Sequence, residues 1–147
     1  MKKLIFIGLL IAGLASGCRY NNVYINREED NNDGKKIVKE IYDNVASGNF
    51  NELDVLTSDS LKRLVGQNGV SKLAHYINKK VGKFKSYDIN DFYIRSVVGS
   101  NNIISYNYKL KVVYEKGVID EVIGLVKIAD SPIRISAYRA NSDLLIK

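Results

Sequence analysis

The chain has 147 residues and a formal net charge of +6, with 22 lysines and arginines against 16 aspartates and glutamates. Its single cysteine excludes an intrachain disulfide framework, and its single histidine leaves no cluster of soft ligands for zinc or copper. The basic residues are scattered and form no dense nucleic-acid footprint. We therefore expect a domain held together by its hydrophobic core, without metal, cofactor or bound nucleic acid.

The start of the chain has the layout of a secretion signal. Lys2 and Lys3 form a positive region, an apolar stretch covers 4–14, and small residues precede Cys18. A permanent membrane-spanning helix needs about 20 apolar residues, so this stretch is too short for one. The sequence predicts that residues 1–17 are a signal peptide.

The residues up to Cys18 resemble the lipobox of bacterial lipoproteins. The motif is Leu-Ala-Ser-Gly-Cys at 14–18, with Ala15 where leucine is most usual. The resemblance implies a diacylglyceryl group on the Cys18 thiol, cleavage just before it, and attachment to the extracytoplasmic side of a bacterial membrane. Arg19 is not the aspartate that retains some lipoproteins at the inner membrane, which implies the outer membrane if the host is Gram-negative. An ordinary secretory signal followed by a free cysteine is the alternative.

The segment after Cys18 is polar up to Gly34. Because it offers little apolar surface to offset its ordering entropy, we expect 18–33 to be a flexible tether with a reach of roughly 20 to 24 Å. An alternative, in which this segment packs on the domain or binds a partner, is kept open by its apolar side chains, Tyr20, Val23, Tyr24 and Ile25. A single folded domain is expected over 34–147.

Helices are predicted in the first half of that domain. Apolar residues at helical spacing predict helices over 35–47, 50–56 and 70–81, with a further turn or two between Ser58 and Gly66. Asn32 or Asp33 is the predicted cap of the first helix. We predict turns at Asp33-Gly34 and Asn68-Gly69.

From Lys83 onward the apolar period changes from 3.6 to 2, which is typical of strands. The predicted strands cover about 87–98, 104–114, 118–129 and 133–140. A switch of apolar parity predicts a bulge near Asn90-Asp91, and Gly124 marks a bend or close packing in the third strand. The order indicates an α+β domain in which N-terminal helices pack on a curved four-stranded antiparallel sheet.

Over residues 33–142 this pattern resembles the nuclear-transport-factor-like superfamily with its cystatin-like cone. The resemblance rests on Ile-Tyr-Asp-Asn-Val-Ala-Ser-Gly-Asn-Phe at 41–50 and Gly-Lys-Phe-Lys-Ser-Tyr at 82–87. The ending at 137–143 is similar to small bacterial lipoproteins of this type without assigned activity. The superfamily includes ketosteroid isomerases, dehydratases, transport factors and ligand-free adaptors, so the resemblance implies a fold and no particular reaction.

The ten tyrosines are the most unusual feature of the composition. Core packing is the main interpretation of those predicted between sheet and helices, and a cavity for a small apolar ligand is the functional alternative. These candidate ligand-binding residues are Tyr42, Tyr87, Tyr106, Tyr108 and Tyr114.

Asp91 and Tyr93 are the candidate catalytic residues. An aspartate base beside a tyrosine donor is the arrangement of ketosteroid isomerase, although no motif here matches that enzyme residue by residue. We nevertheless expect Asp91 and Asp120 to face solvent. His75 is predicted on a helix face away from the apolar stripe, so no catalytic triad can be built around it.

The sequence favours a lipid-anchored, non-enzymatic domain that binds a protein partner or a small apolar ligand. The alternative is a small cavity enzyme of isomerase or dehydratase type, and protection of the cell from a toxin is a third possibility. An ordered segment from Tyr20 to Asp30 would favour the adaptor. A carboxylate at the bottom of an open cavity beside a tyrosine hydroxyl would favour the enzyme.

Overall fold

The computed structural model describes residues 21–146, so the predicted signal peptide at 1–17 and Cys18 lie outside the described residues. The strands are β1 (Asn22–Ile25), β2 (Phe84–Val98), β3 (Ile103–Tyr114), β4 (Gly117–Ile128) and β5 (Arg134–Asn141). The helices are α2 (Glu28–Ser47), α3 (Phe50–Val55), α4 (Asp59–Val65), α5 (Gly69–Val81) and the short 3-10 helix η1 (Asp143–Leu145). The fold class is α+β, as predicted.

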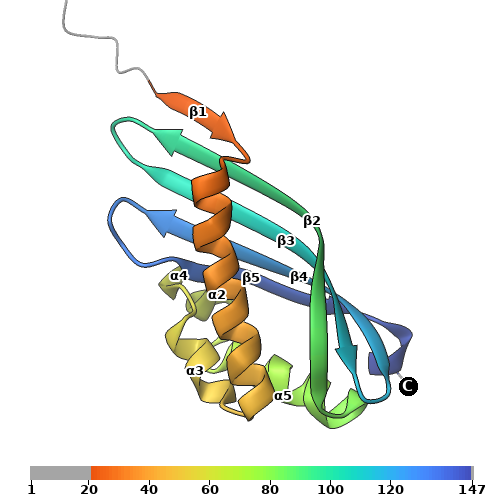
Figure 1. The fold of residues 1–147 in the computed structure, drawn as a ribbon. Coiled ribbons are helices and arrows are strands. Elements are labelled where there is room, and N and C mark those ends of the chain that lie inside the picture. The colour runs from red at the N-terminus through yellow and green to blue at the C-terminus, as the bar shows by residue number, and fades with distance from the viewer. Residues whose placement is uncertain (1–20, 147) are drawn as a thin grey trace, which may run out of the picture.

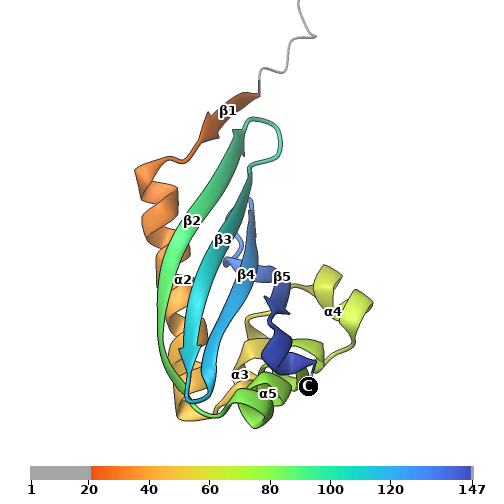
Figure 2. The same cartoon turned by 90° about the vertical axis from the view of Figure 1, so that its right-hand side faces the viewer.

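The five strands form one antiparallel sheet in the order β1-β2-β3-β4-β5. The prediction of four strands was wrong by one, because β1 adds to the edge of the sheet beside β2. Helix α2 crosses the sheet, and α3 and α5 lie at the end of the molecule opposite β1 (Figures 1 and 2). Along β3, the inward-facing Tyr106, Tyr108 and Leu110 are buried, whereas Lys109 and Lys111 are exposed on the outer face.

Irregular pairing bends the sheet as the sequence predicted. The register between β2 and β3 shifts between Ile89 and Asp91, which confirms the predicted bulge, and a second shift lies between Phe84 and Ser86. Between β4 and β5 the register shifts next to Gly124. Figure 1 shows β2 bending along its length. Since each bulge adds local twist, the sheet curves over the helices.

The expected tether at 18–33 contains regular structure in the residues described. Strand β1 occupies Asn22–Ile25, and α2 begins at Glu28, seven residues before the predicted start at Lys35. Asn32 and Asp33 therefore lie inside the helix and do not cap it. Arg27 occupies the N-cap position with extended backbone and no side-chain cap.

The turn predicted at Asn68-Gly69 is present at Asn68, where the Gly69 nitrogen donates to the Gly66 oxygen (3.1 Å), and Gly69 is already the first residue of α5. The turn predicted at Asp33-Gly34 was wrong, because Gly34 lies inside α2, buried against the sheet. A Cβ atom added at Gly34 would lie 2.7 Å from Cδ1 of Tyr106 and would clash with the Tyr108 hydroxyl. Glycine is placed here because the helix backbone approaches two tyrosines closely.

Candidate functional site

A buried carboxylate, Glu121 of β4, accepts hydrogen bonds from three tyrosine hydroxyls in the interior of the domain. Its Oε2 accepts hydrogen bonds from the hydroxyls of Tyr42 (2.8 Å) and Tyr138 (2.9 Å), and its Oε1 accepts one from Tyr114 (2.8 Å). The three donors come from α2, β5 and β3. We call these four residues the Glu121 cluster.

Burial controls the protonation of the Glu121 cluster. Glu121 is 1% exposed, and desolvation raises the pKa of its carboxyl group, while the three donated hydrogen bonds act in the opposite direction. Burial also raises the pKa values of Tyr42, Tyr114 and Tyr138, and the nearby Glu121 charge raises them further. The phenols therefore remain protonated and act as donors.

Three of the five candidate ligand-binding tyrosines lie in or beside this cluster. Tyr42 and Tyr114 donate to Glu121, and the ring of Tyr87 stacks on Tyr42 with 4.6 Å between centroids. Phe84 stacks on the same ring at 5.3 Å. These aromatic contacts fill the space around the carboxylate.

Tyr106 and Tyr108 lie elsewhere, beneath the first turns of α2. The Tyr108 hydroxyl donates to the Asn31 backbone oxygen (3.3 Å) and to its Oδ1 (3.2 Å). Burial raises the pKa of Tyr106 to about 12. Both side chains fill the space between sheet and helices, as predicted.

The candidate catalytic pair lies on the outer face of the sheet. Asp91 is paired with Lys109 (Oδ2 to Nζ, 2.9 Å), and this hydrogen bond lowers its pKa. Tyr93 is exposed and lines a hollow of about 430 Å³ on the same face. Asp120 pairs with Lys111 at 2.9 Å. The expectation that Asp91 and Asp120 face solvent is confirmed, and neither approaches the interior.

Glu121 and Tyr138 were missed by the sequence reasoning, although a signal existed. Glu121 shares the strand parity of Ile119, Ile123 and Leu125, so the alternation places an acid on the apolar face. A charged residue in register with a buried face needs a partner, and the tyrosines were the available donors.

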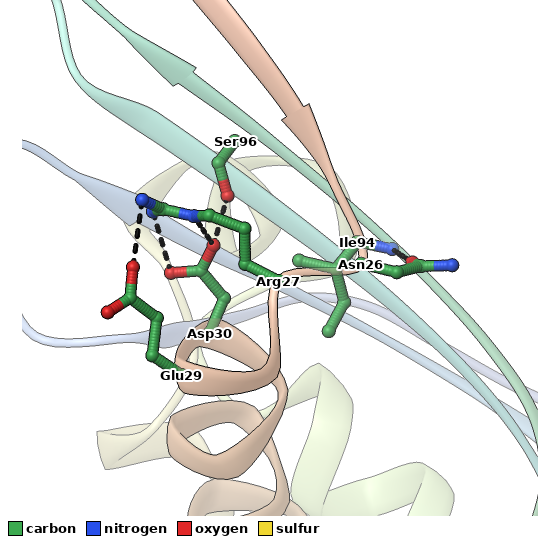
Figure 3. Close-up of polar contacts among 6 residues, drawn as sticks. All are labelled: Asn26, Arg27, Glu29, Asp30, Ile94 and Ser96. Atoms are coloured by element: carbon green, nitrogen blue, oxygen red, sulfur yellow. Dashed lines mark hydrogen bonds and ion pairs between the residues drawn. The ribbon is translucent and has the colours of Figure 1, made fainter.

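A second buried carboxylate, Asp30, fastens the N-terminal segment to the sheet (Figure 3). Its two oxygens accept hydrogen bonds from Arg27 Nε (2.7 Å) and a terminal Arg27 nitrogen (3.0 Å), and the Ser96 hydroxyl of β2 also donates to it. The Arg27 guanidinium lies 5.0 Å from the centroid of the Tyr24 ring. Charge-assisted, two-point contacts of this kind fix geometry strongly.

Asn26 joins β1 to α2 beside this ion pair. Its φ of 51° lies in the left-handed region, which asparagine tolerates better than most residues. Its backbone nitrogen donates to the Ile94 oxygen (2.9 Å). Its Oδ1 accepts from the Ile94 nitrogen (2.8 Å), and Figure 3 shows this second contact. The segment around β1 is thus tied to β2 by backbone and side chain.

A surface groove of about 430 Å³ lies between α3 and α5, at the end of the domain opposite β1. Its aromatic lining comes from Phe50, His75 and Tyr76, and Lys72 and Lys79 stand beside it. The rings of Phe50 and His75 meet edge to face, 5.4 Å between centroids. His75 is exposed, as predicted, and shares this groove with the two lysines.

Within residues 21–146, no cluster of three histidine, cysteine or acidic residues could hold a metal ion. No helix in the same part of the chain is long and apolar enough to cross a membrane. Comparison with protein-family models, with curated proteins and with solved structures finds no match to this chain.

Proposed function

We propose that the protein is a lipid-anchored binding or adaptor domain, without catalytic activity, on the extracytoplasmic side of a bacterial membrane. The lipid is carried by Cys18, and in a Gram-negative host the membrane is the outer one. The domain has the cystatin-like cone of the nuclear-transport-factor-like superfamily. The α+β order, the bulged sheet and the helices packed on one face support that assignment.

The filled interior carries this proposal. No buried side-chain nitrogen or oxygen within residues 21–146 lacks a hydrogen-bond partner. Both oxygens of Glu121 and both of Asp30 are already engaged by side chains of the domain. Since a substrate pocket needs polar groups free to meet its ligand, the interior favours a structural role and directs binding to the surface.

The groove between α3 and α5 is the surface we assign to the partner. Phe50 and Tyr76 offer aromatic contact area, and the lysines at 72 and 79 give the rim a positive charge. Aromatic side chains supply much of the binding energy at protein interfaces, and charged rims steer association. The groove therefore fits an acidic segment of a partner protein. The ordered residues 22–30 also favour the adaptor over the enzyme.

The anchor is tested by Cys18→Ala. Native protein should fractionate with membranes, and mass spectrometry of its N-terminal peptide should find diacylglyceryl on Cys18. The variant, once freed of its signal, should be released, because no apolar helix in residues 21–146 could hold it in a bilayer. Membrane retention of the processed variant would contradict the anchor.

Binding at the groove is tested by Lys72→Glu combined with Lys79→Glu. The immobilised mature protein is incubated with detergent-solubilised envelope proteins of the host, and the captured proteins are identified. The double variant should lose a partner that the unaltered protein retains. A control with the same charge change outside the groove, Lys36→Glu with Lys85→Glu, should keep it. Equal capture by both variants would assign the partner to another surface.

One observation favours the cavity enzyme as a second candidate. The Glu121 cluster joins a carboxyl group of raised pKa to tyrosine donors, which are the parts of a proton-transfer site. Small apolar ketones that enter it should raise the melting temperature of the protein but not that of Glu121→Gln. A screen without such a difference would leave the binding proposal in place.

A further inference from the structure

The described fold begins very close to the proposed lipid. Cys18 precedes Asn22, the first residue of β1, by four residues, which span at most about 14 Å when fully extended. Strand β1 is held to β2 by four paired residues and by the Asn26 and Asp30 contacts. A lipid on Cys18 would therefore hold the β1 end of the sheet within about 14 Å of the head groups, a much shorter reach than the expected tether allowed.

Exposed apolar side chains gather at this same end, on the outer face of the sheet. Register places Val23 of β1 beside Val97 of β2, Val97 beside Ile103 of β3, and Ile103 beside Ile128 of β4. Ile25 lies two residues along β1 and faces the same side. We call these five residues the tip patch. Val23, Ile25, Ile103 and Ile128 are 50%, 49%, 37% and 55% exposed.

The tip patch is unusual for an outer sheet face. Towards the other end of that face, Asp91 pairs with Lys109 and Asp120 pairs with Lys111, so the surface is charged. Two exposed residues, Tyr93 and Arg95, follow the patch along the outer face of β2. An apolar surface bordered by tyrosine and arginine resembles the residue order of membrane interfaces, where aromatic rings and basic side chains lie at head-group level.

We propose that the tip patch rests on the lipid bilayer and orients the domain, with the α3–α5 groove pointing away from the membrane. This inference rests on the proposed lipid at Cys18. The short connection brings the patch to the bilayer surface, and its apolar side chains leave water there. Helices α3 and α5, whose side chains line the groove, lie at the end of the molecule far from β1 (Figures 1 and 2), where a partner can approach.

The experiment compares two positions on the outer face of β4. Ile128→Cys places a thiol in the tip patch, and Val118→Cys places one near the other end of the same face, at a residue that is 49% exposed. Because the thiol of Cys18 is blocked when acylated, an environment-sensitive fluorophore reacts with the new cysteine alone. The full mature lipoprotein is reconstituted into phosphatidylethanolamine and phosphatidylglycerol vesicles that contain a lipid quencher with a nitroxide on its acyl chain.

The expected result is a blue-shifted emission that is quenched at position 128, with neither effect at position 118. Aqueous emission from both positions on acylated protein would overturn the inference and leave the lipid anchor standing. Equal quenching at both positions would also overturn it, because the domain would then lie flat. An unmodified Cys18 thiol would refute the anchor and this inference together. A shift at position 128 that persists without lipid, with a dimer in sedimentation, would assign the patch to a second copy.

Discussion

Tyr42 of α2 donates a 2.8 Å hydrogen bond to Glu121 of β4, 79 residues away in the chain. This contact joins α2 to the inner strand β4 in the interior of the domain. Glu121 also accepts hydrogen bonds from the hydroxyls of Tyr114 and Tyr138, so one carboxyl group binds side chains from three other elements, α2, β3 and β5. A buried carboxyl group of this kind is stabilised because both of its oxygens accept hydrogen bonds.

Removing this acceptor should destabilise the domain. Glu121→Ala leaves three hydroxyls without their acceptor, and we expect a loss of about 3 kcal/mol or more in the free energy of unfolding, since each buried unsatisfied group costs about 1–3 kcal/mol. Glu121→Gln retains one acceptor oxygen and should lose less. Urea unfolding followed by circular dichroism measures both.

Asp120→Asn is the matched control for these variants, because Asp120 is the neighbouring acid and faces solvent. We expect its effect on unfolding to stay within about 0.5 kcal/mol. If Glu121→Ala were as mild as the control, the buried carboxylate would not hold the cluster together.

The raised pKa of Glu121 predicts how stability depends on pH. The folded protein holds this proton at pH values where the unfolded chain, with an ordinary pKa of about 4.3, has lost it. The contribution of this proton to stability is therefore fully present below the pKa of the unfolded chain. It is lost as the pH rises through the higher pKa of the folded protein. The difference in unfolding free energy between native protein and Glu121→Gln should decrease over this range and then level off. A difference that grows with pH would mean that the three hydroxyls outweigh desolvation.

The sheet could be predicted from sequence because its signals are local. Period-2 alternation placed four strands to within a few residues, and the parity switch located the bulge between Ile89 and Asp91. Strand β1 could not be found in this way, because four exposed residues have no buried face to create a pattern. Strand β1 is held in place by contacts of Asn26 with Ile94 and of Asp30 with Ser96, and these two partners lie about 70 residues later in the chain.

The polar start of α2 and the Glu121 cluster could not be predicted for the same reason, because both depend on partners that are distant in the chain. Asp30 and Asn31 are polar and would suit a loop, but both are buried because Ser96 and Tyr108 supply partners from the sheet. Glu121 was overlooked because it is recognised as a buried residue only when its position is compared with the alternating apolar residues of β4. Sequence reasoning therefore located Tyr42 and Tyr114 but missed the acid that both contact and its third donor, Tyr138.

Gly34→Ala should destabilise the protein although alanine is the better helix former. The added methyl group would meet the rings of Tyr106 and Tyr108, and crowding in a packed core typically costs about 1–3 kcal/mol. Alanine recovers about 1 kcal/mol of helix propensity, so we expect a net loss of up to about 2 kcal/mol. Thermal unfolding measures it, with Asn32→Ala on the exposed side of the same helix as control. A Gly34→Ala protein more stable than the control would show that the helix shifts to accommodate the methyl group.

Asp30→Ala should release β1 while the rest of the sheet stays folded. The substitution removes the acceptor of Arg27 and Ser96, and hydrogen bonds to charged groups contribute about 1.5–3 kcal/mol each. Strand β1 has only four residues and pairs on one side, so its backbone pairing and the two Asn26–Ile94 hydrogen bonds are what then oppose its opening. Hydrogen exchange should accelerate for the amides of residues 22–26, with protection retained in β3 and β4. Glu29→Ala is the control, because Glu29 also pairs with Arg27 but is 72% exposed, and screened surface pairs contribute little. Unchanged protection of β1 in Asp30→Ala would show that its backbone pairing alone holds the strand, and equal acceleration in Glu29→Ala would assign the effect to Arg27 and not to the buried carboxylate.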